Sequence, residues 1–174
     1  VPSGGGVKET YLRWYNETKD WNEAAWQTWM QIGYGKTGTS PQLAARLKYF
    51  RPGHDQAVMN RDRLMSAALT EMNALQAGYQ RPAVPRVMLG EHALIKKMDD
   101  FMSDGVTRGD FFEHDKVVAM QVATIIVADE GQNRESDEQA LYDRERRAFL
   151  ELAKTEKTGL RISAMLDGQG ALRN

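Results

Sequence analysis

Hydrophobic residues recur at helical spacing along almost the whole of this 174-residue chain. Between Leu64 and Leu75, for example, they stand three or four residues apart, which places them on one face of a helix. No segment shows a persuasive strand-like alternation of apolar and polar residues, and the best β candidate is the short stretch 86–89. The pattern predicts an all-α fold of about seven helices with little or no sheet.

Glycine, proline and capping residues bound these helices. A helical pattern starts at Lys8, continues through Trp29 and is stopped by Gly33 and Gly35. Ser40 before Pro41 is a typical start, with Ser as N-cap and Pro as the first helical residue. Further helices are predicted over 60–77 with Asn60 as cap, over 91–102 with a stop at 103–105, from 113 to 126, from 138 to 152 and over 160–166, before a loose tail at 168–174.

Two prolines, Pro82 and Pro85, indicate an extended linker over residues 81–90. The linker divides the chain into a helical part over 1–80, which starts with a glycine-rich turn, and a C-terminal helical lobe over 91–174. The helix that contains Val117, Val122 and Ile125 is apolar on nearly all sides, so we expect it at the centre of this lobe.

Composition excludes several classes of function. The chain has 23 Lys and Arg against 24 Asp and Glu, a net charge of −1, which gives no general attraction to nucleic acid. It has no cysteine, and therefore no disulfide, thiolate metal site or cysteine nucleophile. Its longest apolar run, 122–128, is far shorter than a membrane span of roughly 18 residues. We expect a cytoplasmic protein without a membrane span.

The titratable residues give no strong site. His54, His92 and His114 have no metal-binding spacing, and we predict no metal and no catalytic residue in this chain. His114 beside Asp115 could form an acid–base pair, but a helix cap by Asp115 is favoured. The acidic residues between 91 and 113 alternate with lysine and arginine, which is typical of a solvated face.

Two clusters allow a functional and a structural interpretation. Trp14, Trp21, Trp26 and Trp29 could form a stacking platform or an acyl-chain channel, although packing between helices is the commoner use of such aromatics. The arginines of the segment 144–147 could bind CoA phosphates, but their interleaving with Asp143, Glu145 and Glu151 favours surface ion pairs.

The run Gly4-Gly5-Gly6, after Pro2-Ser3, opens the first helix. Three glycines let a backbone turn sharply or approach a ligand closely, and helix N-termini attract anions. The turn is therefore either a backbone that faces an anion or thioester, or a disordered tail. Because only Val1 precedes it, we expect the element that leads into this turn to lie upstream.

Several segments, in this order, resemble one family. They are Pro2-Ser3-Gly4-Gly5-Gly6-Val7-Lys8-Glu9, Phe50-Arg51-Pro52, Val58-Met59-Asn60-Arg61-Asp62-Arg63-Leu64, Gly78-Tyr79-Gln80-Arg81-Pro82, Glu113-His114-Asp115, the stretch 142–152, and Leu172-Arg173-Asn174. Together they resemble the C-terminus of bacterial multifunctional 3-hydroxyacyl-CoA dehydrogenases of fatty-acid β-oxidation. In that family an enoyl-CoA hydratase/isomerase-like (crotonase) region follows the dehydrogenase half.

The resemblance implies a site role for one short segment. The backbone of Ser3, Gly4 and Gly5 would lie beside bound water or the acyl group, while 1–80 would be the helical tail of the crotonase-like region. The hydratase carboxylates and the NAD-binding region lie upstream of this turn in the family. The resemblance therefore implies NAD and an acyl-CoA substrate for the parent protein, and neither a cofactor nor activity for this chain alone.

The predicted function is thus that of a C-terminal segment of a β-oxidation enzyme of the 3-hydroxyacyl-CoA dehydrogenase and enoyl-CoA hydratase type. It would cap the active site, shape the acyl pocket and bind the rest of the parent polypeptide, in a homo-oligomer. The alternative is a non-enzymatic helical module for interaction or oligomerisation.

Overall fold

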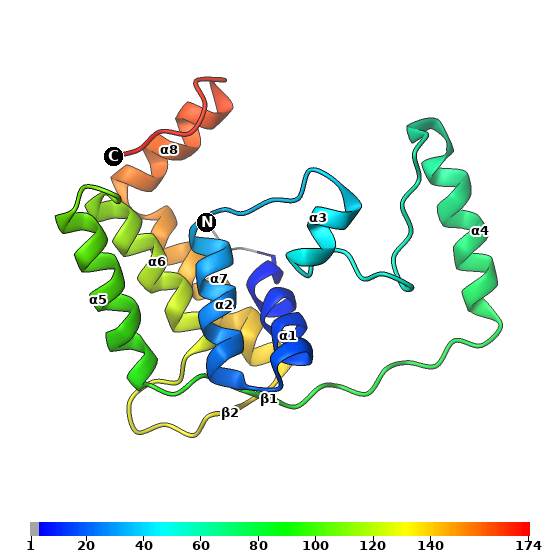
Figure 1. The fold of residues 1–174 in the computed structure, drawn as a ribbon, viewed down its shortest axis with the longest axis horizontal. Coiled ribbons are helices and arrows are strands. Elements are labelled where there is room, and N and C mark those ends of the chain that lie inside the picture. Colours follow the sequence, from blue (N-terminus) through cyan, green and yellow to red (C-terminus); the bar gives the residue numbers. More distant parts are fainter. Residues whose placement is uncertain (1–3) are drawn as a thin grey trace. The chain divides into compact units, whose positions relative to one another are not determined.

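The computed structural model describes residues 4–174, and helices are the main regular structure of these residues (Figure 1). They form eight α-helices, one 3₁₀ helix and two strands of two residues each, so the predicted all-α class is confirmed. The elements are α1 (Gly6–Thr18), α2 (Trp21–Gly33), α3 (Pro41–Arg46), η1 (Arg61–Arg63), α4 (Leu64–Gln76), β1 (Val87–Met88), α5 (Ala93–Thr107), α6 (Glu113–Ile126), β2 (Glu135–Ser136), α7 (Glu138–Ala153) and α8 (Glu156–Leu166).

Side-chain caps set where most of these helices begin. Ser40 and Asn60 cap α3 and η1 as predicted, and Asp137 accepts a hydrogen bond from the Ala140 N–H at the start of α7. The prediction of about seven helices missed one break. Lys19 has a left-handed backbone (φ 56°) that ends α1, and Asp20 then caps α2 through the N–H groups of its first turn.

The chain folds into two compact units, and their boundaries differ from those of the predicted lobes. One unit contains the N-terminal residues up to 36 together with 85–174, and the other contains 37–84. Helices α1 and α2 therefore belong with the C-terminal helices and not with α3 and α4. The cause is the core: Tyr11 and Ala25 have no exposed surface and belong to the same buried cluster as Ile125.

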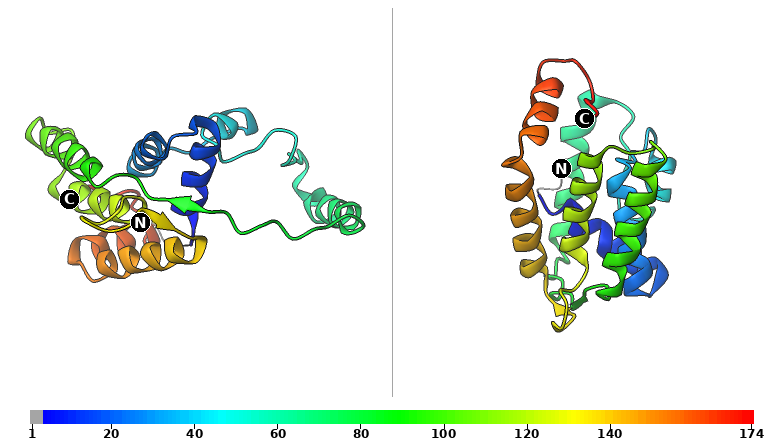
Figure 2. Two further views of the ribbon diagram at one scale, coloured as in Figure 1. Left: turned by 90° about the horizontal axis from the view of Figure 1, so that it is seen from below. Right: turned by 90° about the vertical axis from the view of Figure 1, so that its left-hand side faces the viewer.

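Helix α6 is central to the larger unit, as predicted. It contacts α5 and α7, and also α1 and α2. Figure 2 shows α5, α6 and α7 running side by side. Val122, Ile125 and Ile126 are at most 1% exposed, whereas Val117 is 44% exposed because it lies on the side that no neighbour covers.

The two strands join the segment before α5 to the segment before α7. Val87 pairs with Ser136 and Met88 with Glu135 in an antiparallel ladder, which places a strand in the predicted segment 86–89. Residues 81–86 of the predicted linker have no regular structure. Arg134 reinforces the connection, since its Nε donates to the Leu89 carbonyl oxygen at 2.8 Å.

Two predicted boundaries are wrong for local reasons. Helix α5 continues past 103–105 to Thr107, because Gly105 stays helical and leaves room for the Phe111 ring, 2.2 Å from where a Cβ would be. The tail at 168–174 is not loose throughout. Arg161 Nε donates to Asn174 Oδ1 at 2.8 Å, and the Asn174 amide donates to the Lys157 carbonyl oxygen.

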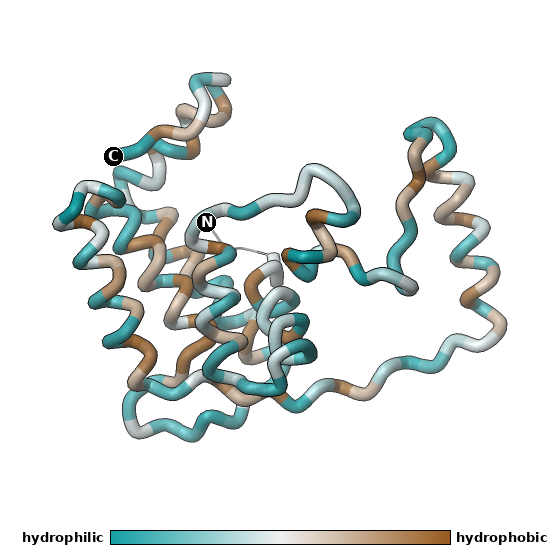
Figure 3. The backbone as a smooth tube through the Cα atoms, in the orientation of Figure 1, coloured by the Kyte–Doolittle hydropathy of each residue, from teal (hydrophilic) through white to brown (hydrophobic). Residues whose placement is uncertain are grey.

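The smaller unit, residues 37–84, is described throughout, and none of its residues is buried. Helix α4 carries apolar residues between its polar ones (Figure 3). Leu64, Met65, Leu69, Met72 and Leu75 are each 49% to 72% exposed. Within residues 4–174, no helix combines the length and apolar character that crossing a membrane requires.

Candidate functional site

The glycine-rich turn lies against helix α7. Gly5 is the N-cap of α1, and its N–H donates to Glu145 Oε1 at 2.9 Å. The N–H of Lys8 donates to Glu145 Oε2 at 3.4 Å. The N-terminus of a helix has unpaired N–H groups and a positive dipole end. In this structure a carboxylate of the chain itself, 1% exposed, occupies that position.

Packing explains the glycine at position 5. Its φ of 88° is left-handed, and a Cβ would lie 2.4 Å from Cε1 of Tyr142. Both features disfavour any side chain. The Tyr142 ring therefore fills the place where a larger residue would project.

The Lys8 side chain is almost fully buried beside this turn. Its Nζ donates to Glu9 Oε1 at 2.5 Å and to Glu138, and lies 4.8 Å from the centroid of the Tyr142 ring. Burial alone would lower the pKa of Lys8, but the hydrogen bonds to Glu138 and Glu9 raise it above its usual value. Lys8, Glu9, Glu138 and Glu145 form what we call the α1–α7 charge cluster.

The α1–α7 charge cluster contacts Gly5, one of the residues predicted to lie beside substrate. Ser3 lies outside the described residues, Gly4 is exposed, and Gly5 is buried with its N–H bonded to Glu145. The substrate-facing role of this backbone stays a prediction. The assignment of Glu145 to surface ion pairs is wrong, because its carboxylate is needed inside the α1–α7 contact.

Arg144 also does more than form the predicted surface ion pair. Its Nη1 donates to the carbonyl oxygens of Thr124 at 2.6 Å and Val127 at 3.0 Å, and its Nη2 pairs with Asp129 at 2.9 Å. These carbonyls lie at the C-terminus of α6, where a cation is favourable. Arg146 is exposed, as predicted.

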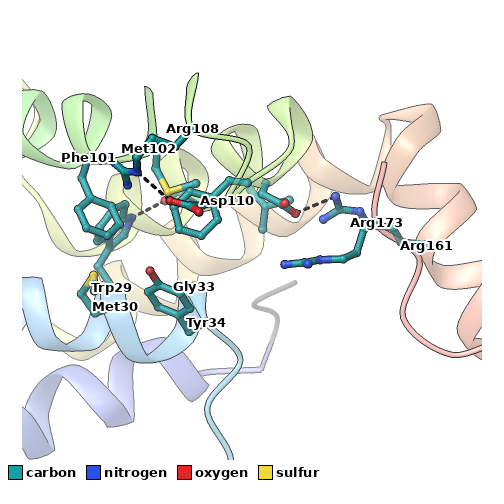
Figure 4. Close-up of a pocket in the computed structure, with 14 residues that line it drawn as sticks. Trp29, Met30, Gly33, Tyr34, Phe101, Met102, Arg108, Asp110, Arg161 and Arg173 are labelled. Atoms are coloured by element: carbon teal, nitrogen blue, oxygen red, sulfur yellow. Dashed lines mark hydrogen bonds and ion pairs between the residues drawn. The ribbon is translucent and has the colours of Figure 1, made fainter. Parts of the chain in front are cut away.

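The larger unit contains a cavity of about 470 Å³ with an aromatic wall. Trp29 and Phe101 meet edge to face with ring centroids 5.7 Å apart, and Phe111 lies 6.1 Å from Phe101. Trp29 is only 2% exposed, and its indole N–H donates to the Ala119 carbonyl oxygen within this wall (Figure 4). The lining consists of Trp29, Met30, Gly33, Tyr34, Phe101, Met102, Arg108, Asp110, Phe111, Asp115, Val118, Ala119, Arg161 and Arg173.

The charged residues of the lining are mostly paired. Arg108 Nε contacts Asp110 at 2.8 Å, and Arg161 Nη2 contacts Asp115 at 2.8 Å. The Arg173 guanidinium has no hydrogen bond or ion pair to any of residues 4–174, and its carbon lies 5.9 Å from the centroid of the Phe112 ring. One arginine at the cavity is therefore available to an anion.

Only one of the four tryptophans lines the cavity. The Trp14 indole N–H donates to Gln31 Oε1 at 3.0 Å, and Trp21 stacks on Tyr15 with centroids 3.5 Å apart. Trp26 meets Phe101 of α5 edge to face, with ring centroids 5.9 Å apart. Packing between helices, the favoured interpretation, is confirmed for these residues. The rest of the lining could not be predicted from the sequence, because it comes from segments that no periodic pattern relates.

His114 and Asp115 do not form an acid–base pair. His114 Nε2 is buried 2.9 Å from Thr158 Oγ1, while the Asp115 carboxylate accepts from the Phe112 N–H and pairs with Arg161. The cap by Asp115 is confirmed. No group of three or more metal-binding side chains occurs in residues 4–174.

The surroundings of His114 make folding sensitive to pH. Burial lowers the pKa of His114 from 6.5, and the charges of Arg161 and Lys157 lower it further, against the opposing effect of Asp115. The unfolded chain then binds the proton more readily than the folded chain. The contribution of neutral His114 to the free energy of unfolding is fully present above pH 6.5. It decreases as the pH falls below 6.5, by at most about 1.4 kcal/mol per pH unit.

Urea unfolding at pH 7.5 and 5.5 measures this loss. Other groups titrate as well, so the comparison is with His114→Gln. The wild type is expected to lose more stability between the two pH values than the variant. Equal losses would mean that the folded state does not disfavour protonated His114.

Comparison with curated proteins found a relative over the whole chain. A Bacillus subtilis (strain 168) protein described as a probable 3-hydroxyacyl-CoA dehydrogenase is 29% identical over 180 residues, a match that covers 100% of this chain. The chain spans 22% of the length of this relative. No protein-family model matches the chain. No solved structure matches it either. The chain is thus distantly similar to one part of a dehydrogenase, and the crotonase assignment stays a prediction.

Proposed function

We propose that this chain is a helical segment of a larger NAD-dependent 3-hydroxyacyl-CoA dehydrogenase that acts in fatty-acid β-oxidation in the cytoplasm. The observation that carries the proposal is the similarity to the Bacillus subtilis protein, which extends over 100% of the chain. The order of the sequence segments that resemble this family supports the same assignment.

In this proposal the segment does not perform the hydride transfer. A dinucleotide-binding GxGxxG sequence follows a strand, whereas the one in this chain, at 33–38, starts at the end of helix α2. Its part is structural: the Ser3–Gly4–Gly5 backbone would adjoin the acyl group of an enoyl-CoA hydratase-like site, and α1, which begins directly after Gly5, would support it. The α1–α7 charge cluster would hold it in position.

The purified chain alone is therefore expected to be inactive. Formation of NADH from 3-hydroxybutyryl-CoA, followed by absorbance, tests the dehydrogenase reaction, and loss of crotonyl-CoA absorbance tests hydration. Turnover by the chain would refute the non-catalytic role. Because a contaminating enzyme could imitate it, the folding-defective variant Ile125→Asp, purified in the same way, serves as control.

A second candidate function, that of an interaction module, is favoured by α4. Its exposed apolar residues include Leu69 and Met72, and its unit has no buried residue that would let this face pack internally. Apolar surfaces of this kind are typical of association sites. In this proposal two copies of the chain associate through α4.

Sedimentation tests the association. The chain is expected to sediment as an oligomer, and Leu69→Glu combined with Met72→Glu is expected to give a monomer, because a charge would be buried in the contact. The matched control is Leu160→Glu combined with Met165→Glu, the same change at two exposed apolar residues of α8 in the other unit. A wild-type chain that sediments as a monomer at high concentration would contradict the association.

A further inference from the structure

We infer that the cavity of the larger unit binds a small amphiphilic monocarboxylate, with its apolar tail against Trp29, Phe101 and Phe111 and its carboxylate on Arg173. This inference does not rest on the proposed dehydrogenase function. It rests on the lining of the cavity, its charge and its size.

The wall opposite Arg161 and Arg173 selects an apolar group. Its rings are those of Phe101, Phe111 and the nearly buried Trp29, and Met30 and Val118 add aliphatic surface. The polar atom of Trp29 is already used, since its indole N–H donates to the Ala119 carbonyl oxygen at 2.8 Å. Trp29 therefore offers no hydrogen bond to a ligand tail, whereas an alkyl chain gains free energy when its surface is removed from water.

The charges select a single anionic head group. The lining holds three arginines and two aspartates, and the aspartates are each paired with an arginine. Arg173 is the arginine that has no carboxylate partner among residues 4–174. A guanidinium binds a carboxylate through two parallel hydrogen bonds, so one carboxylate would satisfy it.

The same lining disfavours other ligand classes. A head group with several phosphates would bring its additional charges close to Asp110 and Asp115 and would be repelled. A neutral or cationic head group would leave Arg173 without an anion. The volume of about 470 Å³ lies within the range of roughly 300–1,000 Å³ that is common for small-molecule sites.

The chain also fixes the position of Arg173. Its neighbour Asn174 accepts hydrogen bonds from Arg161 Nε at 2.8 Å and, through its carbonyl oxygen, from Arg161 Nη2 at 3.2 Å. Arg161 is itself held by Asp115 on α6. Figure 4 shows Arg161 and Arg173 on the same side of the cavity, away from Trp29 and Phe101. Arg161 is thus a positioning residue, and Arg173 contacts the ligand.

The test is a titration of the full chain with octanoate, followed by the four tryptophan indole N–H signals in a ¹⁵N NMR spectrum. Octanoate is expected to shift the Trp29 signal. Butyrate is expected to bind at least about 10-fold more weakly, because its tail buries less apolar surface. Octylamine and octanol, with the same tail and no anion, are expected to bind at least about 10-fold more weakly as well.

Variants locate the carboxylate. Arg173→Gln is expected to weaken octanoate binding about 10-fold or more and to leave octanol binding unchanged, while Arg173→Lys retains part of the affinity. Arg146→Gln, which removes an exposed arginine outside the cavity, is the matched control and is expected to change nothing. The inference is overturned if octanoate leaves the Trp29 signal in place, if octylamine binds as well as octanoate, or if Arg173→Gln and Arg146→Gln behave alike.

Discussion

Ile125→Asp is expected to prevent the larger unit from folding. Ile125 has no exposed surface and lies in the helix that contacts α1, α2, α5 and α7. A carboxylate there would have no partner, and burying an unpaired charge costs more than a domain can lose. Circular dichroism and urea unfolding would show loss of the cooperative transition.

The milder change Ile125→Ala gives a graded version of the same result. Removing the branched side chain leaves a cavity and is expected to cost about 2–5 kcal/mol. That is a large part of the roughly 5–15 kcal/mol that stabilises a typical domain. Arg146→Ala, on the exposed side of α7, is expected to cost less than about 1 kcal/mol. If Ile125→Ala costs no more than Arg146→Ala, α6 is not the centre of the unit.

Glu145→Ala is expected to destabilise the larger unit by about 2–4 kcal/mol. The variant removes the acceptor of the buried Gly5 and Lys8 N–H groups, and each buried donor without a partner costs about 1–3 kcal/mol. It also removes a negative charge from the N-terminus of α1. Urea unfolding measures the loss, and hydrogen exchange should be fastest in the first turn of α1.

Glu151→Ala is the matched control on the same helix. Glu151 is exposed and, among residues 4–174, pairs only with Lys154, so its loss is expected to cost less than about 1 kcal/mol. Glu145→Gln should fall between the two, because the amide oxygen can still accept from Gly5. A Glu145→Ala chain as stable as Glu151→Ala would mean that the carboxylate does not hold the turn.

Local features of the fold could be predicted from the sequence. Ser40 with Pro41, and Asn60, mark helix starts because a short polar side chain satisfies the first N–H groups wherever the helix lies. The apolar run around Val122 and Ile126 identified a buried helix, because no solvated surface suits such a segment. These are properties of neighbouring residues and need no knowledge of the tertiary fold.

The assembly of the helices could not be predicted in the same way. Pro82 and Pro85 correctly indicated irregular backbone, but they do not reveal that α1 and α2 pack beyond them on α6 and α7. Glu145 and Arg144 look like members of a charged helix face. Only the fold brings the first to the N-terminus of α1 and the second to the C-terminus of α6.

The candidate sites also combine local features, which the sequence shows, with contacts that only the fold creates. The glycine turn was recognisable because three glycines are a local signal. Its contacts with Tyr142 and Glu145 could not be predicted, because these residues are far from it in the sequence. Of the cavity lining, Trp29 was a candidate as part of an acyl-chain channel, and Arg173 stood in the sequence only as part of a resemblance. Nothing local to either residue shows that the two line one cavity.

The most direct measurement is NADH formation from 3-hydroxybutyryl-CoA by the whole polypeptide in which this chain is encoded. That protein is expected to catalyse NAD-dependent oxidation, and the 174-residue chain alone is expected to catalyse none. The activity of the whole protein is expected to be lost when Ile125→Asp unfolds this segment. A folded whole protein that forms no NADH with short-chain or long-chain 3-hydroxyacyl-CoA would contradict the proposed function.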